Sequence, residues 1–248
     1  MKDSIIEDLH RALKDAAGGR KPEPDRKYHK HDEYLTYGLN ASAYREIMRK
    51  FHPRFLDLEL QERLALAEKL CAENVGDIGH TGIYAIVQSI NELDPSHFPV
   101  FDRIAENFRS WSHVDALSLY VFQPLMQKYK KDILNLVKTW SSSPVRWKRR
   151  ASIVVFTRKA AKTGEFTDIV MEMSSYLAFD REDIVQKGTG WALKDNLRSA
   201  PEKIIPFVKE LRQKGAPSTV ILYAIRDLKG KKRNMILKIQ KEIQLKPR

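Results

Sequence analysis

The feature that most constrains the fold of this chain is a long succession of apolar positions at helical spacing, broken only by brief turns. Apolar side chains recur three or four residues apart, as at Ile5, Leu9 and Leu13, and each run ends near Pro, Gly or Ser. Alternating apolar and polar residues hardly ever extend over the length of a strand. The pattern therefore predicts an all-α protein made of short helices.

The expected helices occupy most of the chain. They span residues 4–17, 40–51, 56–74, 81–91, 97–108, 110–123, 126–140, 146–162, 166–177, 182–198, 200–213 and 218–228. The stretch 28–37 holds three tyrosines and two histidines, and we expect a helix that packs aromatic rings, with ligand contact as the alternative. We expect one domain over residues 1–248, in which 1–25 form a first helix and loop and 229–248 a basic tail.

A loose repeat accompanies these helices. Arg150-Ala151 and Lys187-Gly188 lie 37 residues apart, and each pair opens a helical apolar run. Helix pairs at this spacing are typical of HEAT-like or armadillo-type superhelices. Such folds stack helices in layers and leave a concave face for binding.

Charge and cysteine content narrow the classes of function. Lys and Arg number 44 against 32 Asp and Glu, a formal net charge of +12, which favours nucleic acid or an anionic membrane as partner. Cys71 is the single cysteine, so an internal disulfide and a thiolate zinc cluster are excluded. The histidines form no credible metal site, and no apolar run approaches the ~20 residues of a membrane span. Because the first helix is acidic, we expect no secretory signal and a cytoplasmic protein, associated with the nucleoid if prokaryotic.

One predicted helix combines a tryptophan with three cations. Lys187, Trp191, Lys194 and Arg198 follow one another at steps of four, three and four, which places them on one helical face. A polyanion would neutralise these mutually repelling cations and give the indole ring a surface to pack against. We interpret this face as a contact for nucleic acid.

A second helix carries an acidic candidate. Trp111 and Asp115 are four residues apart and share a face, and Ser110 or Ser112 can cap the helix so that Asp115 falls in its first turn. A carboxylate there is also common for structural reasons. Arg150 and Arg158, eight residues apart in the helix expected over 146–162, would share a face as well.

Three segments together carry a resemblance to a known family. They are Trp111-Ser-His-Val-Asp115, Arg146-Trp-Lys-Arg-Arg150-Ala-Ser-Ile and Gly188-Thr-Gly-Trp191-Ala-Leu-Lys194. In order and separation they resemble the signature segments of the AlkD family of alkylpurine DNA glycosylases. The resemblance is clearest over residues 108–196 and extends more faintly to Tyr28 and to the segment 38–45.

The resemblance implies a HEAT-like α-superhelix whose concave basic groove holds duplex DNA, and excision of positively charged N3- or N7-alkylated purines in base excision repair. It implies that Trp111 and Trp191 contact the sugar of the lesion nucleotide, that Asp115 faces its anomeric carbon, and that Arg150 holds a phosphate. No metal or other cofactor is implied. Further expected DNA contacts are Tyr28, Asn40, Arg45, Lys148, Arg149, Arg158, Lys159, Lys187, Lys194 and Arg198, although Lys148 or Arg149 can instead be solvated.

Two departures and two alternatives accompany this hypothesis. Lys194 stands where the family pattern predicts arginine, which weakens a bidentate grip on phosphate, and His113 has no assigned role. One alternative is a non-catalytic helical repeat that recognises bent or branched DNA. The other is a protein-binding scaffold. For the glycosylase we expect a monomer whose partner is duplex DNA containing alkylated purines.

Overall fold

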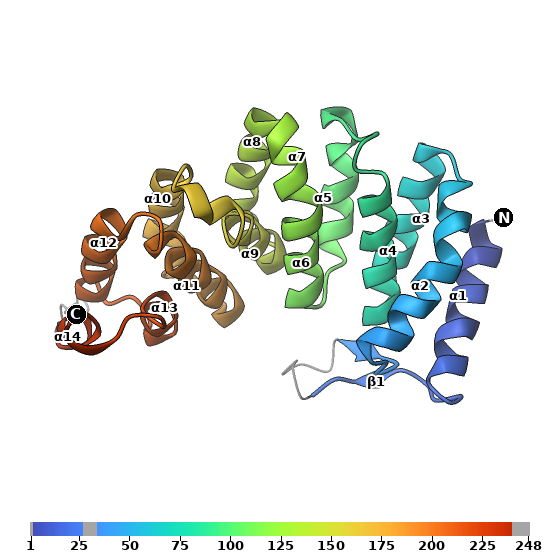
Figure 1. Ribbon diagram of the computed structural model, residues 1–248, viewed down its shortest axis with the longest axis horizontal. Helices are drawn as coiled ribbons and strands as arrows, with labels where there is room; N and C mark the ends of the chain where they lie inside the picture. Colours follow the sequence, from blue (N-terminus) through green and yellow to red (C-terminus); the bar gives the residue numbers. More distant parts are fainter. Residues whose placement is uncertain (1, 27–33, 240–248) are drawn as a thin grey trace. The chain divides into compact units, whose positions relative to one another are not determined.

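The computed structural model describes residues 2–26 and 34–239, and most of these residues lie in helices (Figure 1). The predicted all-α fold is confirmed. The chain divides into two compact units, Met1–Asp132 and Ile133–Arg248, which are described in turn. A single repeat domain over the whole chain, and a concave groove along it, stay predictions.

The first unit is a succession of helices that pack mainly on their near neighbours in the chain. Its elements are α1 (Lys2–Ala16), β1 (Glu23–Pro24), β2 (Leu35–Thr36), α2 (Ala41–Leu56), α3 (Leu60–Ala72), α4 (Gly76–Gln88), η1 (Pro95–His97), α5 (Phe98–Glu106), α6 (Trp111–Leu117), η2 (Ser118–Phe122) and α7 (Gln123–Lys128). Helix α3 packs against α4 and α5, and α4 packs against α2 and α6. This neighbour-on-neighbour packing is typical of helical repeats.

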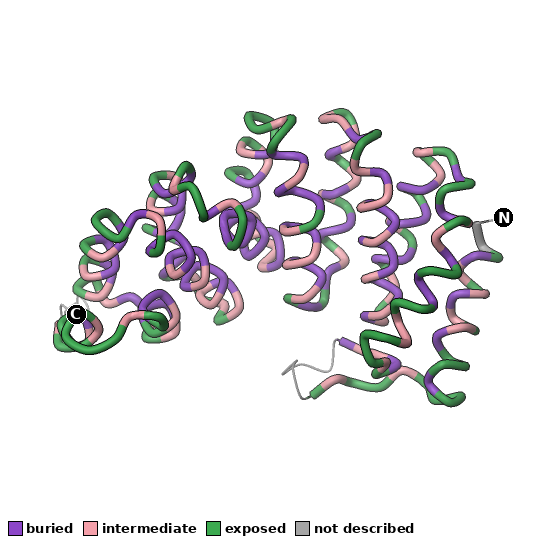
Figure 2. The backbone as a smooth tube through the Cα atoms, viewed as in Figure 1, coloured by how far each residue is buried: buried purple, intermediate pink, exposed green. Residues whose placement is uncertain are grey.

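Apolar spacing accounts for the buried faces of these helices. In α1, Ile5, Leu9 and Leu13 recur every four residues and are 2%, 0% and 0% exposed. The residues of each helix are buried where it meets its neighbours and exposed on its outward faces (Figure 2). Burial of such rows, rather than helix propensity, stabilises helices as short as these.

The N-terminal connection departs from the expected helix over residues 28–37. Leu35 and Thr36 instead form β2, which pairs in antiparallel register with β1, Pro24 opposite Leu35 and Glu23 opposite Thr36. Leu35 also makes an isolated parallel bridge to Val75, just before α4. The backbone of this segment is thus paired with strands, not helical; residues 28–33 of the expected helix lie outside the described part of the chain.

The helix that begins at Trp111 continues further than the sequence indicated. A π-helical turn, η2, joins α6 directly to α7, and the N–H of Gln123 donates to the carbonyl of Ser118. Pro124 explains the turn, since its ring nitrogen has no N–H to donate to the carbonyl of Tyr120. Helix α7 then ends at Lys128, with Tyr129 as its C-cap.

The second unit is organised around one central helix. Its elements are α8 (Lys130–Ser141, from Ile133 onward), α9 (Arg146–Val154), η3 (Ala160–Thr163), α10 (Thr167–Leu177), α11 (Asp183–Leu197), α12 (Pro201–Gln213), α13 (Ser218–Ala224) and α14 (Gly230–Leu237). Helix α11 packs against α9 and α13 on its two sides and also against α10 and α12 (Figure 1). It is buried along much of its length (Figure 2).

Two glycines allow the close approach of α11 to its neighbours. A Cβ atom on Gly190 would lie 2.7 Å from the Cβ of Tyr223 and 2.9 Å from the carbonyl oxygen of Val220, both in α13. A Cβ atom on Gly188 would lie 3.2 Å from a methyl group of Val154 in α9. The Gly-Thr-Gly segment before Trp191 therefore serves packing, and it fixes where that tryptophan lies.

The helix expected over residues 146–162 is wrong in its second half. Helix α9 ends at Val154, and Arg158 has φ of 51°, in the left-handed region that ordinary residues avoid. Tertiary hydrogen bonds hold the backbone beyond the helix: Arg158 N donates to Asp195 Oδ2 at 2.8 Å, and Asn196 Nδ2 donates to the carbonyl of Phe156 at 3.0 Å. Arg150 and Arg158 therefore do not share a helical face.

Candidate functional site

The positive charge of the chain is concentrated in its second unit. Residues 133–248 contain 25 of the 44 Lys and Arg but only 11 of the 32 Asp and Glu, a formal net charge of +14. Residues 1–132 carry the remaining 19 basic and 21 acidic residues, a net charge of −2. A polyanionic partner is therefore attracted mainly by the second unit.

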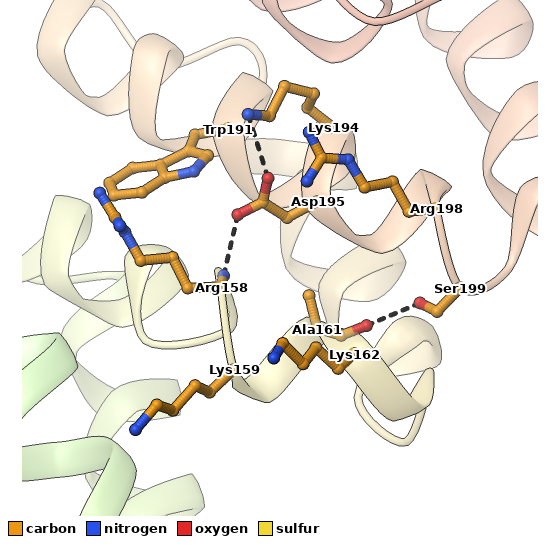
Figure 3. Close-up of a pocket in the computed structure, with 9 residues that line it drawn as sticks. All are labelled: Arg158, Lys159, Ala161, Lys162, Trp191, Lys194, Asp195, Arg198 and Ser199. Carbon is orange, nitrogen blue, oxygen red and sulfur yellow. Dashed lines mark hydrogen bonds and ion pairs between the residues drawn. The ribbon is translucent and has the colours of Figure 1, made fainter.

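A cavity of about 590 Å³ in the second unit gathers much of the predicted cationic set (Figure 3). The first wall is the segment after α9, and the opposite wall is the second half of α11. The cavity is lined by Arg158, Lys159, Ala161, Lys162, Trp191, Lys194, Asp195, Arg198 and Ser199. Five of these residues are cationic, one is acidic and one is aromatic.

Asp195 organises this cavity from within. Its side chain is 8% exposed; one carboxylate oxygen accepts the N–H of Arg158 at 2.8 Å, and the other lies 3.1 Å from Lys194 Nζ. The guanidinium of Arg158 stands 5.3 Å from the centroid of the Trp191 ring, a cation–π contact. The cavity thus presents an indole among cations, with its one carboxylate already engaged (Figure 3).

The far rim of the cavity is closed by two further contacts. Ser199 Oγ donates to the carbonyl of Ala161 at 2.7 Å, which ties the end of α11 to η3. Arg198 forms an ion pair with Asp227, and the side chain of Arg198 remains 64% exposed. Since an exposed ion pair of this kind is weak, Arg198 is available to a competing anion.

Of the four residues predicted to share one helical face, Trp191, Lys194 and Arg198 line this cavity. Lys187 does not, and its Nζ pairs with Asp183 at 2.7 Å one turn earlier. Asp195 was missed, although it lies four residues after Trp191 and the same spacing rule would have found it.

In the first unit, α6 presents the acidic candidate. Trp111 is 37% exposed, and Asp115, one turn later, is half-buried rather than sealed in the core. Ser110 caps the helix as predicted, since its side chain accepts the N–H of Ser112 at 3.0 Å. Asp115 is nevertheless the fifth residue of α6, so the expectation that it lies in the first turn is wrong, and the helix dipole contributes little to it.

His113 has a structural position. It is 4% exposed, and its Nε2 donates to the carbonyl of Gly76 at 2.9 Å, which ties α6 to the start of α4. Its ring also lies close to those of Tyr34 and Phe108, at 5.6 Å and 5.8 Å between centroids. These contacts answer the open question of why a histidine stands between Trp111 and Asp115.

Two predicted cations of α9, Lys148 and Arg149, make contacts inside the second unit. Arg149 makes a two-pronged ion pair with Asp180, at 2.6 Å and 3.1 Å, and also donates to the carbonyls of Ser143 and Pro144. Lys148 is buried, with Nζ 5.8 Å from the Trp140 ring. These contacts give Lys148 and Arg149 a structural role, and that either of them contacts a phosphate stays a prediction.

Arg150, which was expected to hold a phosphate, is buried between α9 and α11. The residue is 6% exposed, and its Nη1 donates to the carbonyl of Ile184 in α11 at 2.6 Å. Its stem lies beside Gly188, whose missing Cβ leaves room for it. Arg150 thus joins α9 to α11 whatever else it contacts.

The remaining predicted residues belong to the first unit. Asn40 is the N-cap of α2, where its Oδ1 accepts the N–H groups of Ser42 and Ala43, so its carbonyl oxygen is used structurally. Arg45 is exposed on α2, and Tyr28 lies outside the described residues. In the ranges 2–26 and 34–239, no three His, Cys, Asp or Glu side chains gather in a group that could hold a metal ion. Over the same ranges, no helix has both the length and the apolar content of a membrane span.

The geometry thus forms two groups, Trp111 with Asp115 in the first unit and Trp191 with its cations in the second. Residues 9–228 match the family of DNA alkylation repair enzymes. The fold is similar to a solved structure described as a predicted DNA alkylation repair enzyme from Enterococcus faecalis, with a TM-score of 0.70 over 79% of this chain and 89% of that chain. At 14% identity this likeness shows the fold alone, and no curated protein matches the chain. Because the family match spans most of its length, the chain belongs to the DNA alkylation repair enzyme family, with DNA as its partner.

Proposed function

We propose that the protein is a DNA glycosylase that hydrolyses the N-glycosidic bond of N3- and N7-alkylated purines in duplex DNA, without a metal. The observation that carries the proposal is the cavity in which Trp191 stands among five cations, in a member of an alkylation repair family. A surface that is both cationic and aromatic suits a sugar–phosphate chain better than a protein partner.

The chemistry explains why so few groups are needed. An alkylated purine is positively charged, so when the bond from C1′ to the ring nitrogen breaks, the electron pair neutralises the departing base and no strong general acid is required. The unstable partner is the sugar, on which positive charge develops. A carboxylate near C1′ stabilises that charge and can orient the attacking water and accept its proton.

In the proposal Asp115 supplies this carboxylate. Its half-buried position suits the role, because a partly desolvated charge acts more strongly on a neighbour than an exposed one while water still reaches it. Trp111 lies one turn earlier on α6, and the negative face of an indole attracts the same developing charge. Trp191 is proposed to act on the same charge with its own indole face.

Phosphate contacts would come from the cavity of the second unit. Arg158, Lys159, Lys162, Lys194 and Arg198 are the proposed set, and Lys148 and Arg149 are left out because they are engaged internally. Each phosphate neutralised lowers the slope of log K against log salt by about 0.9, so five contacts predict a slope near −4.5. The Lys159→Ala variant should make the slope less steep by about 0.9.

The proposal is tested by base release. Methylated duplex DNA incubated with the wild-type protein should yield free 3-methyladenine and 7-methylguanine. We expect Asp115→Asn to slow release by about 10²- to 10³-fold, the usual effect of removing one transition-state stabiliser. Asp102→Asn, a half-buried carboxylate on α5, is the matched control and should stay near the wild-type rate. Binding without release by the wild type, or equal rates for the two variants, would contradict the proposal.

One observation favours a second candidate, a non-catalytic DNA-binding protein. Arg150, expected to hold the phosphate near the lesion, is buried and donates to the carbonyl of Ile184. If it stays there when DNA binds, the protein would hold DNA without completing a catalytic site. This candidate predicts salt-sensitive binding that survives Asp115→Asn and yields no free base.

A further inference from the structure

The segment from Tyr34 to Tyr37 is fastened to the start of α4 by its backbone and side chains. Thr36 Oγ1 and the N–H of Tyr37 both donate to Asp77 Oδ2, at 2.8 Å and 2.7 Å. Leu35 forms its bridge with Val75 immediately before the helix. These contacts leave the segment little freedom, so they determine where the side chain of Tyr34 points.

Tyr34 uses this anchorage to reach α6. Its ring covers Gly76 so closely that a Cβ atom there would fall 2.1 Å from ring carbon, and the residue is 9% exposed. Its hydroxyl forms a side-chain hydrogen bond with Ser112, and burial raises the pKa of Tyr34 to about 12, so the hydroxyl keeps its proton at neutral pH. The ring also lies against α6, with its centroid 5.6 Å from that of His113.

Ser112 is the point at which several contacts meet. Its Oγ also lies 3.1 Å from His80 Nε2 in α4 and 2.7 Å from the Oγ of Ser110, the N-cap of α6. The network therefore ties the first turn of α6 to Tyr34, to α4 and to its own N-cap. Trp111 belongs to that turn, and Asp115 is the residue that comes directly after the turn.

We propose that Tyr34 is a positioning residue, which holds Trp111 and Asp115 in place through its hydrogen bond to Ser112. The catalytic consequence rests on the proposed glycosylase function, while the effect on α6 does not. A shift of about 1 Å in a catalytic group can cost up to 10²-fold in rate, and loss of one of three tethers should cost less. We expect Tyr34→Phe to lower the single-turnover rate of base release about 10-fold and to leave the affinity for DNA unchanged.

The matched control is Tyr37→Phe. This change also removes one hydroxyl from the segment, but the Tyr37 hydroxyl lies 3.4 Å from His10 Nδ1 in α1, away from α6. Both variants should fold and unfold like the wild type within a small margin. Ser112→Ala removes the same hydrogen bond together with the contacts to His80 and Ser110, so, should Tyr34→Phe fail to fold, Ser112→Ala is expected to have at least as large an effect.

A spectroscopic reading separates this inference from the proposed function. The chain has four tryptophans, so 5-fluorotryptophan labelling gives four ¹⁹F resonances, and Trp111→Phe and Trp191→Phe identify two of them. Tyr34→Phe should shift or broaden the Trp111 resonance and leave the Trp191 resonance in place, whereas Tyr37→Phe should move neither. An unmoved Trp111 resonance overturns the inference, even if the rate falls. If the Trp111 resonance moves in Tyr34→Phe while the wild-type protein releases no base, the inference is supported and the glycosylase is refuted.

Discussion

Asp195 offers the sharpest quantitative prediction, because one carboxylate serves both walls of the cationic cavity. It accepts the N–H of Arg158 at 2.8 Å and pairs with Lys194 at 3.1 Å, and its side chain is 8% exposed. Arg158 has φ of 51°, a conformation that costs an ordinary residue about 1 kcal/mol and persists where its surroundings hold it. Replacing Asp195 by alanine removes that support.

The magnitude follows from the two lost interactions. A partly buried N–H without an acceptor costs about 1–2 kcal/mol, and the loss of a hydrogen bond to a charged group about 1 kcal/mol more. Lys194 can turn toward water in the open cavity, so its unpaired charge adds little. We therefore expect Asp195→Ala to lower the free energy of unfolding by about 2–3 kcal/mol.

Asp195→Asn is the comparison that isolates the backbone contact. Its amide oxygen can still accept the N–H of Arg158, while the ion pair with Lys194 is lost, so we expect a cost of about 1 kcal/mol. Urea unfolding followed by circular dichroism measures both variants. A cost below about 0.5 kcal/mol for Asp195→Ala, or equal costs for the two variants, would refute the role given to this carboxylate.

Three further predictions concern buried positions within one unit or the other. Gly190→Ala should lower the free energy of unfolding by about 1–3 kcal/mol, because the new Cβ would press on Tyr223 and Val220 in α13. Gly188→Ala has more room and should change it by less than about 1 kcal/mol. Urea unfolding measures both. Asp180→Asn should cost about 3 kcal/mol, because the guanidinium of Arg149, whose side chain is 11% exposed, loses its negative partner and keeps only backbone carbonyls as acceptors. DNA affinity should stay unchanged in a binding titration, and a loss of affinity at constant stability would contradict this. Burial raises the pKa of the Cys71 thiol from 9.0 to about 12, so the unfolded chain loses this proton at a lower pH than the folded chain does. The free energy of unfolding should therefore fall by about 1.4 kcal/mol per pH unit between pH 9 and 12. In urea unfolding across that range, Cys71→Ala should lack this part of the pH dependence.

Helical periodicity was a sound guide to the fold because local and tertiary preferences agree over most of the chain. The row Ile5, Leu9 and Leu13 predicted a buried face, and the structure buries it. Cap residues were equally informative: Ser110 begins α6 as its residue type suggested, since its hydroxyl satisfies a free N–H of the first turn. The face of α11 with Trp191 was found for the same reason.

The misses arise where distant residues override local preference. The apolar residues Val154, Val155 and Phe156 continue the helical pattern of α9, which nevertheless ends at Val154. Asp195 and Asn196, about 40 residues later, bond the backbone of Arg158 and Phe156 and hold it in a non-helical conformation. Arg149 looked like a surface cation because its partner Asp180 lies 31 residues later in the sequence. The anchorage of Tyr34 on α4 and α6 depends in the same way on contacts that no spacing rule contains.

The central claim is that catalysis needs only a carboxylate and aromatic faces, because the substrate base already carries its charge. The measurement that tests it most directly is single-turnover base release from two matched duplexes, one with 7-methylguanine, which is cationic, and one with hypoxanthine, which is neutral. The account predicts release of 7-methylguanine, dependent on Asp115, and none of hypoxanthine. Failure to release 7-methylguanine, or release of both bases at similar rates, would contradict it.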